Sequence, residues 1–284
     1  MAERKAVIVG ISGASSSGKT TLARLLRDIF PSTFILHEDD FYKAESEYVL
    51  SYAFILFFTL YYSPTRDGLL DWDCAAAIDI PGMAKALAYI RQHATFPVSL
   101  IQAQKHTSRT DHGTKPFVDS KEDKNSVGQC PVSDAKREEM RKKVEAWLQP
   151  GQPGHEVLMQ SQQQDGDGGG GLKICLLDGF LLYSREMQEV MDQLDVKMFL
   201  LVSKAKATQR REARDGYIVW PNYAEAHAWL FEKGDVEAKL DGAVLKEKNI
   251  LAQQGRGLDV DMDTTFEWTV DTLLEQLGRF AKGN

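Results

Sequence analysis

One segment constrains the fold of this chain more than any other: Gly13-Ala14-Ser15-Ser16-Ser17-Gly18-Lys19-Thr20. It satisfies the pattern GxxxxGK[ST], and it lies between an apolar, β-branched run, Ala6 to Ile11, and an amphipathic stretch from Leu22 to Ile29. A glycine-rich turn between a strand and a helix directs successive backbone N–H groups at phosphate oxygens. The sequence therefore predicts a phosphate-binding loop at the start of a nucleotide-binding fold.

Further apolar runs alternate with helical patterns along the chain. This alternation is typical of an α/β fold with crossover connections, so we expect a P-loop NTPase-type, doubly wound parallel sheet with flanking helices. The predicted strands are Ala6 to Ile11, Thr33 to Leu36, Lys173 to Leu177 and Val196 to Val202. The predicted helices are Leu22 to Ile29, Ala75 to Arg91, Asp134 to Leu148, Lys204 to Arg214 and a last one that Thr264 or Thr265 caps.

Composition excludes several classes of protein and of partner. Of 284 residues, 43% are hydrophobic and 26% charged, which excludes a wholly disordered, collagen-like or disulfide-scaffold chain. The net charge of −7 provides no general attraction to nucleic acid or to an anionic membrane, and no feature indicates a protein partner. The three cysteines lack CxxC spacing and the N-terminus lacks a signal peptide, so we expect a reducing compartment, the cytoplasm or also the nucleus.

Two kinds of segment depart from the alternating pattern. Residues 149–171 are rich in Gln and Gly, which predicts a linker or loop, and residues 102–132 are similarly polar. The run Tyr48 to Thr65 contains no charge and is long enough to cross a bilayer. Three interpretations of this run remain open: a membrane span, a buried or partner-facing insertion, and an artefact of gene prediction such as a translated intron.

Acidic residues follow two of the predicted strands. Asp39 and Asp40 come after the second strand, and Asp178 comes after the run Lys173 to Leu177. Ligands of open α/β sheets bind at the carboxyl ends of parallel strands, where these carboxylates would meet the phosphate loop. Phosphoryl transfer to an alcohol requires a carboxylate near the acceptor oxygen and an acidic group for the metal, and this chain supplies both.

Four motifs, GISGASSSGKTTLA, HEDDFYK, DWD and LLDGFLLY, together resemble those of the nicotinamide riboside kinases, within the wider uridine-kinase-like group. The resemblance covers residues 6–47, 69–92 and 172–232. It implies a single kinase domain over residues 1–284, with a helical lid at about 204–223 and insertions at about 48–66 and 100–171. It also implies phosphorylation of the 5′-hydroxyl of nicotinamide riboside, or of nicotinic acid riboside, for NAD salvage.

The resemblance also implies roles for single residues, with ATP and Mg²⁺ as cofactors. Asp39 would accept the proton of the hydroxyl, and Lys19 would neutralise the transferring phosphate. Mg²⁺ would be held by Thr20, Asp39 and Asp178, the last standing where the family has glutamate. The predicted ATP-binding residues are Gly13, Ala14, Ser15, Ser16, Ser17, Gly18, Lys19, Thr20, Thr21, Arg210 and Arg214. The predicted substrate-binding residues are Asp39, Asp40, Phe41, Tyr42, Trp72, Asp73, Arg211 and Tyr217.

The chain departs from the family pattern in its lid. Family members carry a longer stretch with a PPGY-like loop, whereas here Gly216-Tyr217-Ile218 passes directly to Val219-Trp220-Pro221. Altered splicing in the gene model and impaired substrate closure are both consistent with this shortening. Two alternatives to the riboside kinase therefore remain open: a kinase for uridine or another nucleoside, and a nucleotide-binding regulatory protein that has lost turnover.

Overall fold

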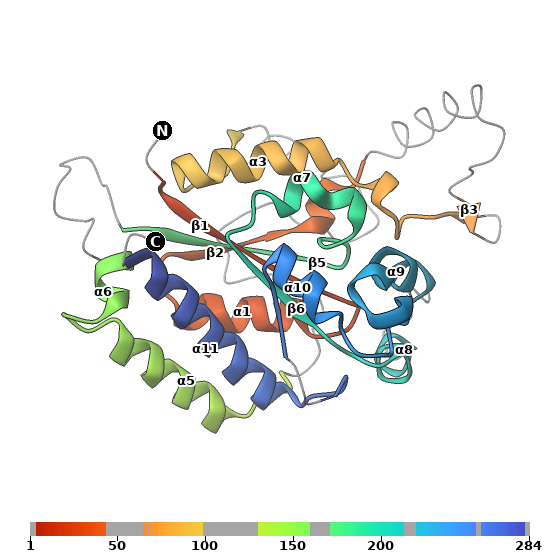
Figure 1. The fold of residues 1–284 in the computed structure, drawn as a ribbon. Helices are drawn as coiled ribbons and strands as arrows, with labels where there is room; N and C mark the ends of the chain where they lie inside the picture. Colours follow the sequence, from red (N-terminus) through yellow and green to blue (C-terminus); the bar gives the residue numbers. More distant parts are fainter. Residues whose placement is uncertain are drawn as a thin grey trace.

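A parallel sheet forms the centre of the molecule (Figure 1). The computed structural model describes residues 4–43, 65–66, 69–98, 130–159, 171–212, 220–253 and 257–281, and for residues 65–66, 69–70 and 211–212 it describes the backbone alone. Within this part the strand order is β2-β5-β1-β6-β7 and every pairing in the sheet is parallel. The strands are β1 (Ala6–Gly13), β2 (Thr33–His37), β5 (Lys173–Gly179), β6 (Val196–Leu200) and β7 (Ile250–Ala252). The four predicted strands and the doubly wound sheet are confirmed, and β7 was missed because it is short.

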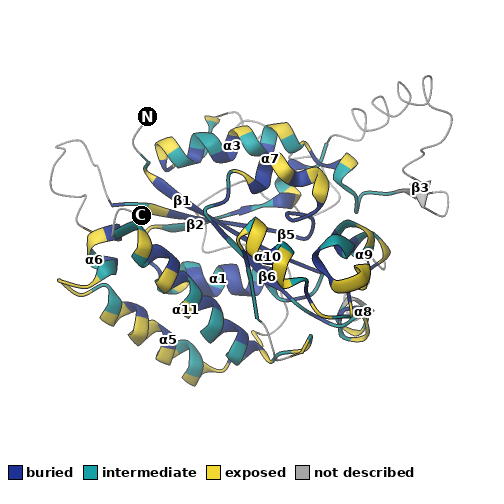
Figure 2. Ribbon diagram, viewed as in Figure 1, coloured by how far each residue is buried: buried dark blue, intermediate teal, exposed yellow. Residues whose placement is uncertain are grey.

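Helices cover both faces of the sheet, and β1 is buried along its whole length (Figure 2). Val7 and Val9 point to one face, and Ile8 points to the other. The first face packs against α1 (Lys19–Ile29), α5 (Asp134–Trp147), α6 (Pro153–Leu158) and α11 (Met262–Ala281). The second face packs against α3 (Ile80–His93), α7 (Gln188–Met191), α9 (Trp220–His227) and α10 (Gly242–Lys248), and α8 (Lys204–Glu212) follows β6.

Strand register brings the carboxyl ends of three strands to one edge of the sheet. Asp178 on β5 pairs with Ile11 of β1 on one side and with His37 of β2 on the other. The next positions along β1, Ser12 and Gly13, lie beside β6. The phosphate loop, the acidic turn after β2 and Asp178 therefore meet, as their positions in the sequence predict.

Three sequence predictions of local structure are wrong. Residues 75–77 form a separate 3-10 turn, and α3 begins only at Ile80, because the Asp79 side chain accepts from Gly82 N and caps the helix there. Helix α11 begins before Thr264, since Asp261 Oδ1 accepts from Thr264 N at 2.8 Å.

The third correction concerns the polar stretch 149–171, which is not a loop throughout. Residues 153–158 form α6, and its Val157 and Leu158 are buried against α11, because even this Gln-rich segment supplies two adjacent core side chains. The segment that carries α5 and α6 therefore belongs to the core of the domain.

The apolar run Tyr48 to Thr65 lies almost entirely outside the described residues, as do residues 102–129. Beside it, β3 (Thr65–Arg66) and β4 (Leu69–Leu70) form a short antiparallel hairpin. Within the described ranges no helix is long and apolar enough to cross a membrane. The three interpretations of the run stay predictions.

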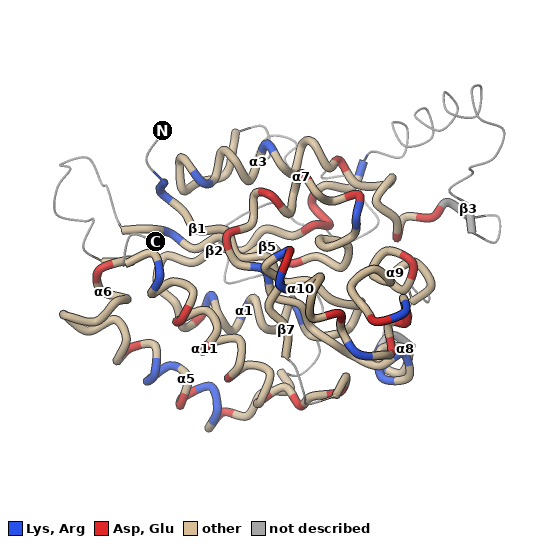
Figure 3. Tube along the Cα trace, in the orientation of Figure 1, with Lys and Arg blue, Asp and Glu red and all other residues tan. Residues whose placement is uncertain are grey.

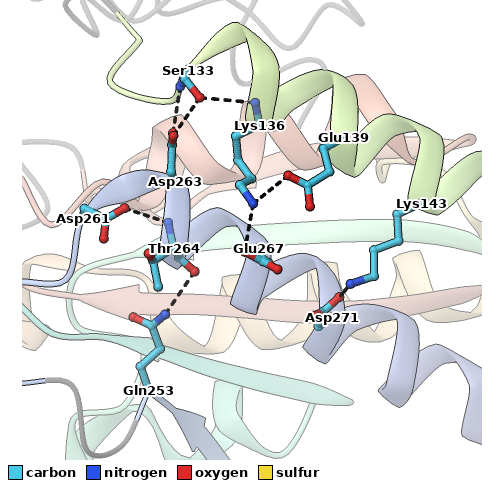
Figure 4. A network of polar contacts seen from close by, with 10 residues as sticks. All are labelled: Ser133, Lys136, Glu139, Lys143, Gln253, Asp261, Asp263, Thr264, Glu267 and Asp271. Atoms are coloured by element: carbon cyan, nitrogen blue, oxygen red, sulfur yellow. Dashed lines mark hydrogen bonds and ion pairs between the residues drawn. The ribbon is translucent and has the colours of Figure 1, made fainter.

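Helix α5 is held on α11 by polar contacts at its surface and by apolar contacts beneath them. Basic and acidic residues alternate along α5 (Figure 3). Lys136 Nζ lies 3.0 Å from Glu267 on α11, Lys143 pairs with Asp271, and Asp263 accepts from both Ser133 N and Ser133 Oγ (Figure 4). Met140 and Val144 of α5 lie in the same apolar cluster as the buried stripe of α11, which comprises Phe266, Val270, Leu273 and Leu277.

We expect the apolar contacts of α11 to stabilise this layer more than its ion pairs do. Phe266 is fully buried, so Phe266→Ala should lower the free energy of unfolding by about 3–5 kcal/mol. Lys143→Ala removes a partly exposed ion pair and should cost less than about 1 kcal/mol. Urea unfolding at neutral pH measures both values, and similar losses for the two variants would contradict this ranking.

Candidate functional site

The phosphate loop adopts the backbone conformation for which its glycines are needed. Gly13 and Gly18 have φ angles of 148° and 103°, in the region that disfavours residues with a Cβ. A Cβ on Gly13 would lie 2.5 Å from the carbonyl oxygen of Leu200, and one on Gly18 would lie 2.9 Å from Met262 Cε. Gly18 also precedes α1 directly, so the loop opens at a helix N-terminus, where backbone N–H groups attract anions.

Lys19 lies inside this loop. Its side chain is largely buried, and Nζ donates to the carbonyl oxygens of Gly13 at 2.8 Å and Ala14 at 2.9 Å. A buried ammonium requires such partners, because burial of an unpaired charge is costly. These bonds hold the cation beside the backbone that would surround a phosphate, and the role of Lys19 stays a prediction.

Asp178 is the centre of a buried polar cluster at the edge of the sheet. Thr20 Oγ1 donates to Asp178 Oδ2 at 2.6 Å, and His37 Nδ1 pairs with Asp178 Oδ1 through a short contact. Burial by itself would raise the pKa of this carboxyl, but His37, Thr20 and Lys19 together lower it below its ordinary value. Asp178 is therefore a buried anion that joins β5 to the end of β2 and to the start of α1.

The two aspartates of the turn after β2 lie in different surroundings. Glu38–Phe41 form one turn of 3-10 helix, in which the Asp39 side chain is exposed and the Asp40 side chain is half-buried. Asp40 Oδ2 accepts from His37 N at 3.2 Å and so caps the turn. Burial raises the pKa of Asp40 to about 6, although His37 opposes this. The turn thus uses Asp40 for its own structure and presents Asp39 to solvent.

Glu38 is a residue of this site that sequence reasoning missed. It is fully buried, its Oε2 accepts from Leu181 N at 3.1 Å, and a Cβ on Gly179 would lie 1.8 Å from that oxygen. Burial raises the pKa of Glu38 to about 8, with a further contribution from Asp39. The available signal was the position of Glu38 directly after an apolar strand, but a sequence pattern does not reveal that its side chain points under Gly179.

The predicted substrate residues after β2 and near Trp72 lie close to one another. Phe41 is part of the core, and Tyr42 forms an isolated bridge with Ile78. The rings of Tyr42 and Trp72 meet edge to face with centroids 6.1 Å apart. Burial raises the pKa of the Tyr42 hydroxyl, and the charges of Asp39, Glu38 and Asp73 add to this. The charges of Asp39 and Asp73 both raise the pKa of the Tyr42 hydroxyl, so both residues lie near it. The structure therefore brings the acidic turn and the Trp72-Asp73 pair to one region.

The lid is described only in part. Arg210, on α8, donates from Nη1 to the carbonyl oxygen of Ser16 at 2.9 Å, so α8 lies against the phosphate loop. The side chain of Arg211 lies outside the described part of the chain, as do Arg214 and Tyr217 altogether. Asp259 holds the start of α8 by accepting from Ser203 N and Ser203 Oγ at 2.9 and 2.7 Å.

A pocket opens beside the phosphate loop, between α8 and the start of α11. Sequence reasoning did not find the part of its lining that comes from residues 253–265. Those residues share no motif, and they reach the pocket only when β7 and α11 pack beside β6. The pocket is lined by Ser17, Leu200, Leu201, Val202, Lys206, Arg210, Gln253, Asp259, Val260, Met262 and Thr265.

The side chains that could hold Mg²⁺ are oxygen donors. Thr20 and Asp178 lie in contact, and their hydroxyl and carboxylate are ligands of the kind that Mg²⁺ prefers. The described residues contain no group of three His, Cys, Asp or Glu arranged to hold a metal ion. Mg²⁺ commonly takes one or two carboxylates and completes its shell with water and substrate phosphates, so the pair fits such a site. The assignment of Thr20, Asp39 and Asp178 as metal ligands stays a prediction.

The buried carboxyl of Glu38 should make stability depend on pH. Its pKa is about 8 in the folded protein against 4.5 ordinarily, so folding retains a proton between these pH values and stability falls as pH rises through this range. Glu38→Gln keeps the shape and cannot titrate. The free energy of unfolding of the variant, relative to that of wild type, should therefore increase by roughly 1.4 kcal/mol for each unit by which the pH rises between 5 and 8.

Urea unfolding of both proteins at pH 5, 6, 7 and 8 measures this difference. Asp40, with a raised pKa, and His227, whose pKa burial lowers to about 4, titrate in both proteins and cancel. Glu145→Gln, at an exposed position on α5, is the control. A difference between Glu38→Gln and wild type that stays constant with pH would show that Glu38 is ionised in the folded protein.

Comparison with known proteins finds that the chain is similar to kinases of one kind. No model of a protein family matches the chain. A nicotinamide riboside kinase of Schizosaccharomyces pombe is 28% identical over 290 aligned positions, which cover 96% of this chain and 99% of that protein. A nicotinamide riboside kinase of Saccharomyces cerevisiae is 25% identical, with 88% of each chain covered. Nicotinamide riboside kinase 1 of Homo sapiens is 33% identical over 84 residues, 30% of this chain and 35% of that protein. The chain is therefore similar to nicotinamide riboside kinases, and to a fungal one along almost its whole length.

Proposed function

We propose that this protein transfers the γ-phosphoryl group of ATP to the ribose 5′-hydroxyl of nicotinamide riboside and so forms the mononucleotide for NAD salvage. One observation carries the proposal: Lys19, the Thr20–Asp178 pair and the turn of Asp39 all lie at the carboxyl ends of the parallel strands. The chain also aligns with a nicotinamide riboside kinase over 96% of its length. The three cysteines are free, which suits the reducing cytoplasm.

The phosphate loop and its neighbouring pocket would bind ATP. Backbone N–H groups of the loop would hold the β-phosphate, and Lys19 would neutralise charge on the transferring group. The pocket begins at Ser17 and Arg210, so it lies next to the loop that would hold the phosphates, and the nucleoside end of ATP would lie on this side of the loop. Mg²⁺, bound by Thr20 and Asp178, would supply charge neutralisation between the phosphates.

Asp39 would act as the general base. The 5′-hydroxyl passes its proton to the Asp39 carboxylate, its oxygen forms the new bond to the γ-phosphorus, and the bond to ADP breaks. One contact and one difference in exposure support this choice of aspartate. Asp40 is used as a cap of the turn, whereas Asp39 presents an exposed carboxylate beside it.

Trp72 and Asp73 would hold the riboside. The indole face suits a pyridinium ring, because a cation over an aromatic face is attracted to it. The Asp73 carboxylate is a natural acceptor for the two ribose hydroxyls. Tyr42 contacts the indole in an edge-to-face pair and connects it with the turn of Asp39.

An assay of the purified chain tests the proposal directly. ATP consumption and product formation are measured with nicotinamide riboside, nicotinic acid riboside and uridine, with Lys19→Ala as the inactive control. Preferential turnover of the two pyridine ribosides supports the proposal. Preference for uridine would favour a nucleoside kinase instead, and ATP binding without product would indicate a regulatory protein with an impaired lid.

We expect Asp39→Asn to lower kcat by roughly 10²–10⁴-fold, the usual contribution of a general base. Asp40→Asn is the matched control: it should lower kcat by less than about tenfold, because the amide oxygen can still accept from His37 N. Steady-state kinetics with saturating ATP and riboside measure both effects. The reverse order would transfer the role of base to Asp40.

Trp72→Leu should penalise nicotinamide riboside more than uridine. Only the pyridinium ring gains the cation–π attraction. The fall in kcat/KM for nicotinamide riboside should therefore exceed that for uridine by a factor equivalent to roughly 0.5–2 kcal/mol. Asp73→Ala should reduce kcat/KM for both substrates alike, because both present the same ribose hydroxyls. Equal losses for the two ribosides on Trp72→Leu would reduce the indole to a packing role.

A further inference from the structure

Two residues outside every predicted site join the lid region to the loop that carries Trp72 and Asp73. Asn222 lies in the first turn of α9, and its Nδ2 donates to both carboxylate oxygens of Asp71, at 2.7 Å and 2.8 Å. The residues are separated by 151 positions in the sequence. A hydrogen bond to a carboxylate is stronger than one between neutral groups, so this contact is a substantial tether.

Asp71 is also hydrogen-bonded to two residues that follow it in the sequence, Asp73 and Cys74. Its Oδ1 also accepts from Asp73 N at 3.0 Å, and its carbonyl oxygen accepts from Cys74 Sγ at 3.3 Å. These local bonds fold residues 71–74 into a compact turn with Trp72 inside it. Asp71 therefore restrains the Asp73 backbone and, with it, the turn that carries Trp72.

The other end of the same loop is attached to the acidic turn after β2. Lys43 N donates to the carbonyl oxygen of Ala77 at 2.9 Å, and Asp79 N donates to that of Phe41 at 2.8 Å. Residues 71–79 thus connect two anchors: the turn that carries Asp39 on one side, and helix α9 on the other. The Asn222 contact attaches the end of the loop near Trp72 to α9.

Helix α9 is a firm anchor, because its opposite face is buried. Tyr223 and His227 are inaccessible to solvent, and the His227 ring stacks on Phe199 of β6 with centroids 5.5 Å apart. Trp220 packs on Tyr223 with centroids 5.2 Å apart. Asn222 is therefore presented from a helix that is fixed to the central sheet.

We propose that Asp71 and Asn222 are positioning residues, which together fix the Trp72-Asp73 turn for riboside binding without a part in ATP binding. This inference rests on the proposed function for the identity of the substrate. Neither residue lines the pocket beside the phosphate loop, and neither contacts Lys19 through any hydrogen bond described above. Loss of the pair should therefore affect the two substrates unequally.

The test is an exchange of the two side chains. Asn222→Asp places two carboxylates opposite each other, so we expect the KM for nicotinamide riboside to rise roughly tenfold or more, while the KM for ATP changes less than about threefold. The double variant Asp71→Asn/Asn222→Asp restores an amide opposite a carboxylate, and the amide oxygen introduced at position 71 can still accept from Asp73 N. It should recover the riboside KM to within about threefold of wild type. Glu225→Ala, at an exposed position of the same helix, is the control and should change neither KM.

Hydrogen exchange in the absence of substrate supplies a readout that does not depend on activity. Asn222→Asp should accelerate amide exchange in residues 71–74 but not in β1 or α11, and the double variant should reverse this. Unchanged exchange in residues 71–74, equal rises in both KM values, or no recovery in the double variant would each overturn the proposal. If wild type does not phosphorylate the riboside, the proposed function fails, and the exchange measurement still decides whether the pair positions the turn.

Discussion

The site depends on the contacts that the buried carboxylate of Asp178 makes with Thr20 and His37. Asp178 lies on β5, receives a hydrogen bond from Thr20 at the start of α1, and pairs with His37 at the end of β2. A buried charge without partners would be strongly destabilising, so these contacts must form together with the sheet. The same contacts hold the phosphate loop, the acidic turn and β5 in one arrangement. The anion is therefore both a structural link and a candidate metal ligand.

Near this anion, three consecutive acidic residues, Glu38, Asp39 and Asp40, have different surroundings. Asp40 and Glu38 flank Asp39, but one caps the turn and the other is buried under Gly179 with a pKa raised to about 8. Asp39 alone of the three has an exposed side chain. A turn of 3-10 helix distributes consecutive side chains in different directions, which gives three neighbouring carboxyl groups three different environments.

The two substrates would be bound by different parts of the chain. The ATP side would be formed by the phosphate loop, α8 and residues before α11, and the riboside side by the loop 71–79 between the acidic turn and α9. Asp178 lies between them, in contact with Thr20 beside the phosphate loop and with His37 before the acidic turn. Restraints on one side, such as the Asp71–Asn222 pair, can therefore influence one substrate without the other.

The sequence alone determined the sheet, the phosphate loop and the presence of acidic residues at strand ends, because these depend on local patterns: apolar runs, glycines at fixed spacing, and residues that directly follow a strand. The sequence-based prediction of where α3 and α11 begin was wrong, because Asp79 and Asp261 cap these helices through side-chain contacts that helix propensity does not reveal. It also missed α6, whose two apolar residues are buried only by α11. The tertiary structure alone decided which carboxyl is buried, which caps a turn and which is exposed, and it alone joined Asn222 to Asp71 across 151 positions. Such contacts depend on the packing of distant segments, whose distances and burial are determined only when the whole sheet and its helices have assembled.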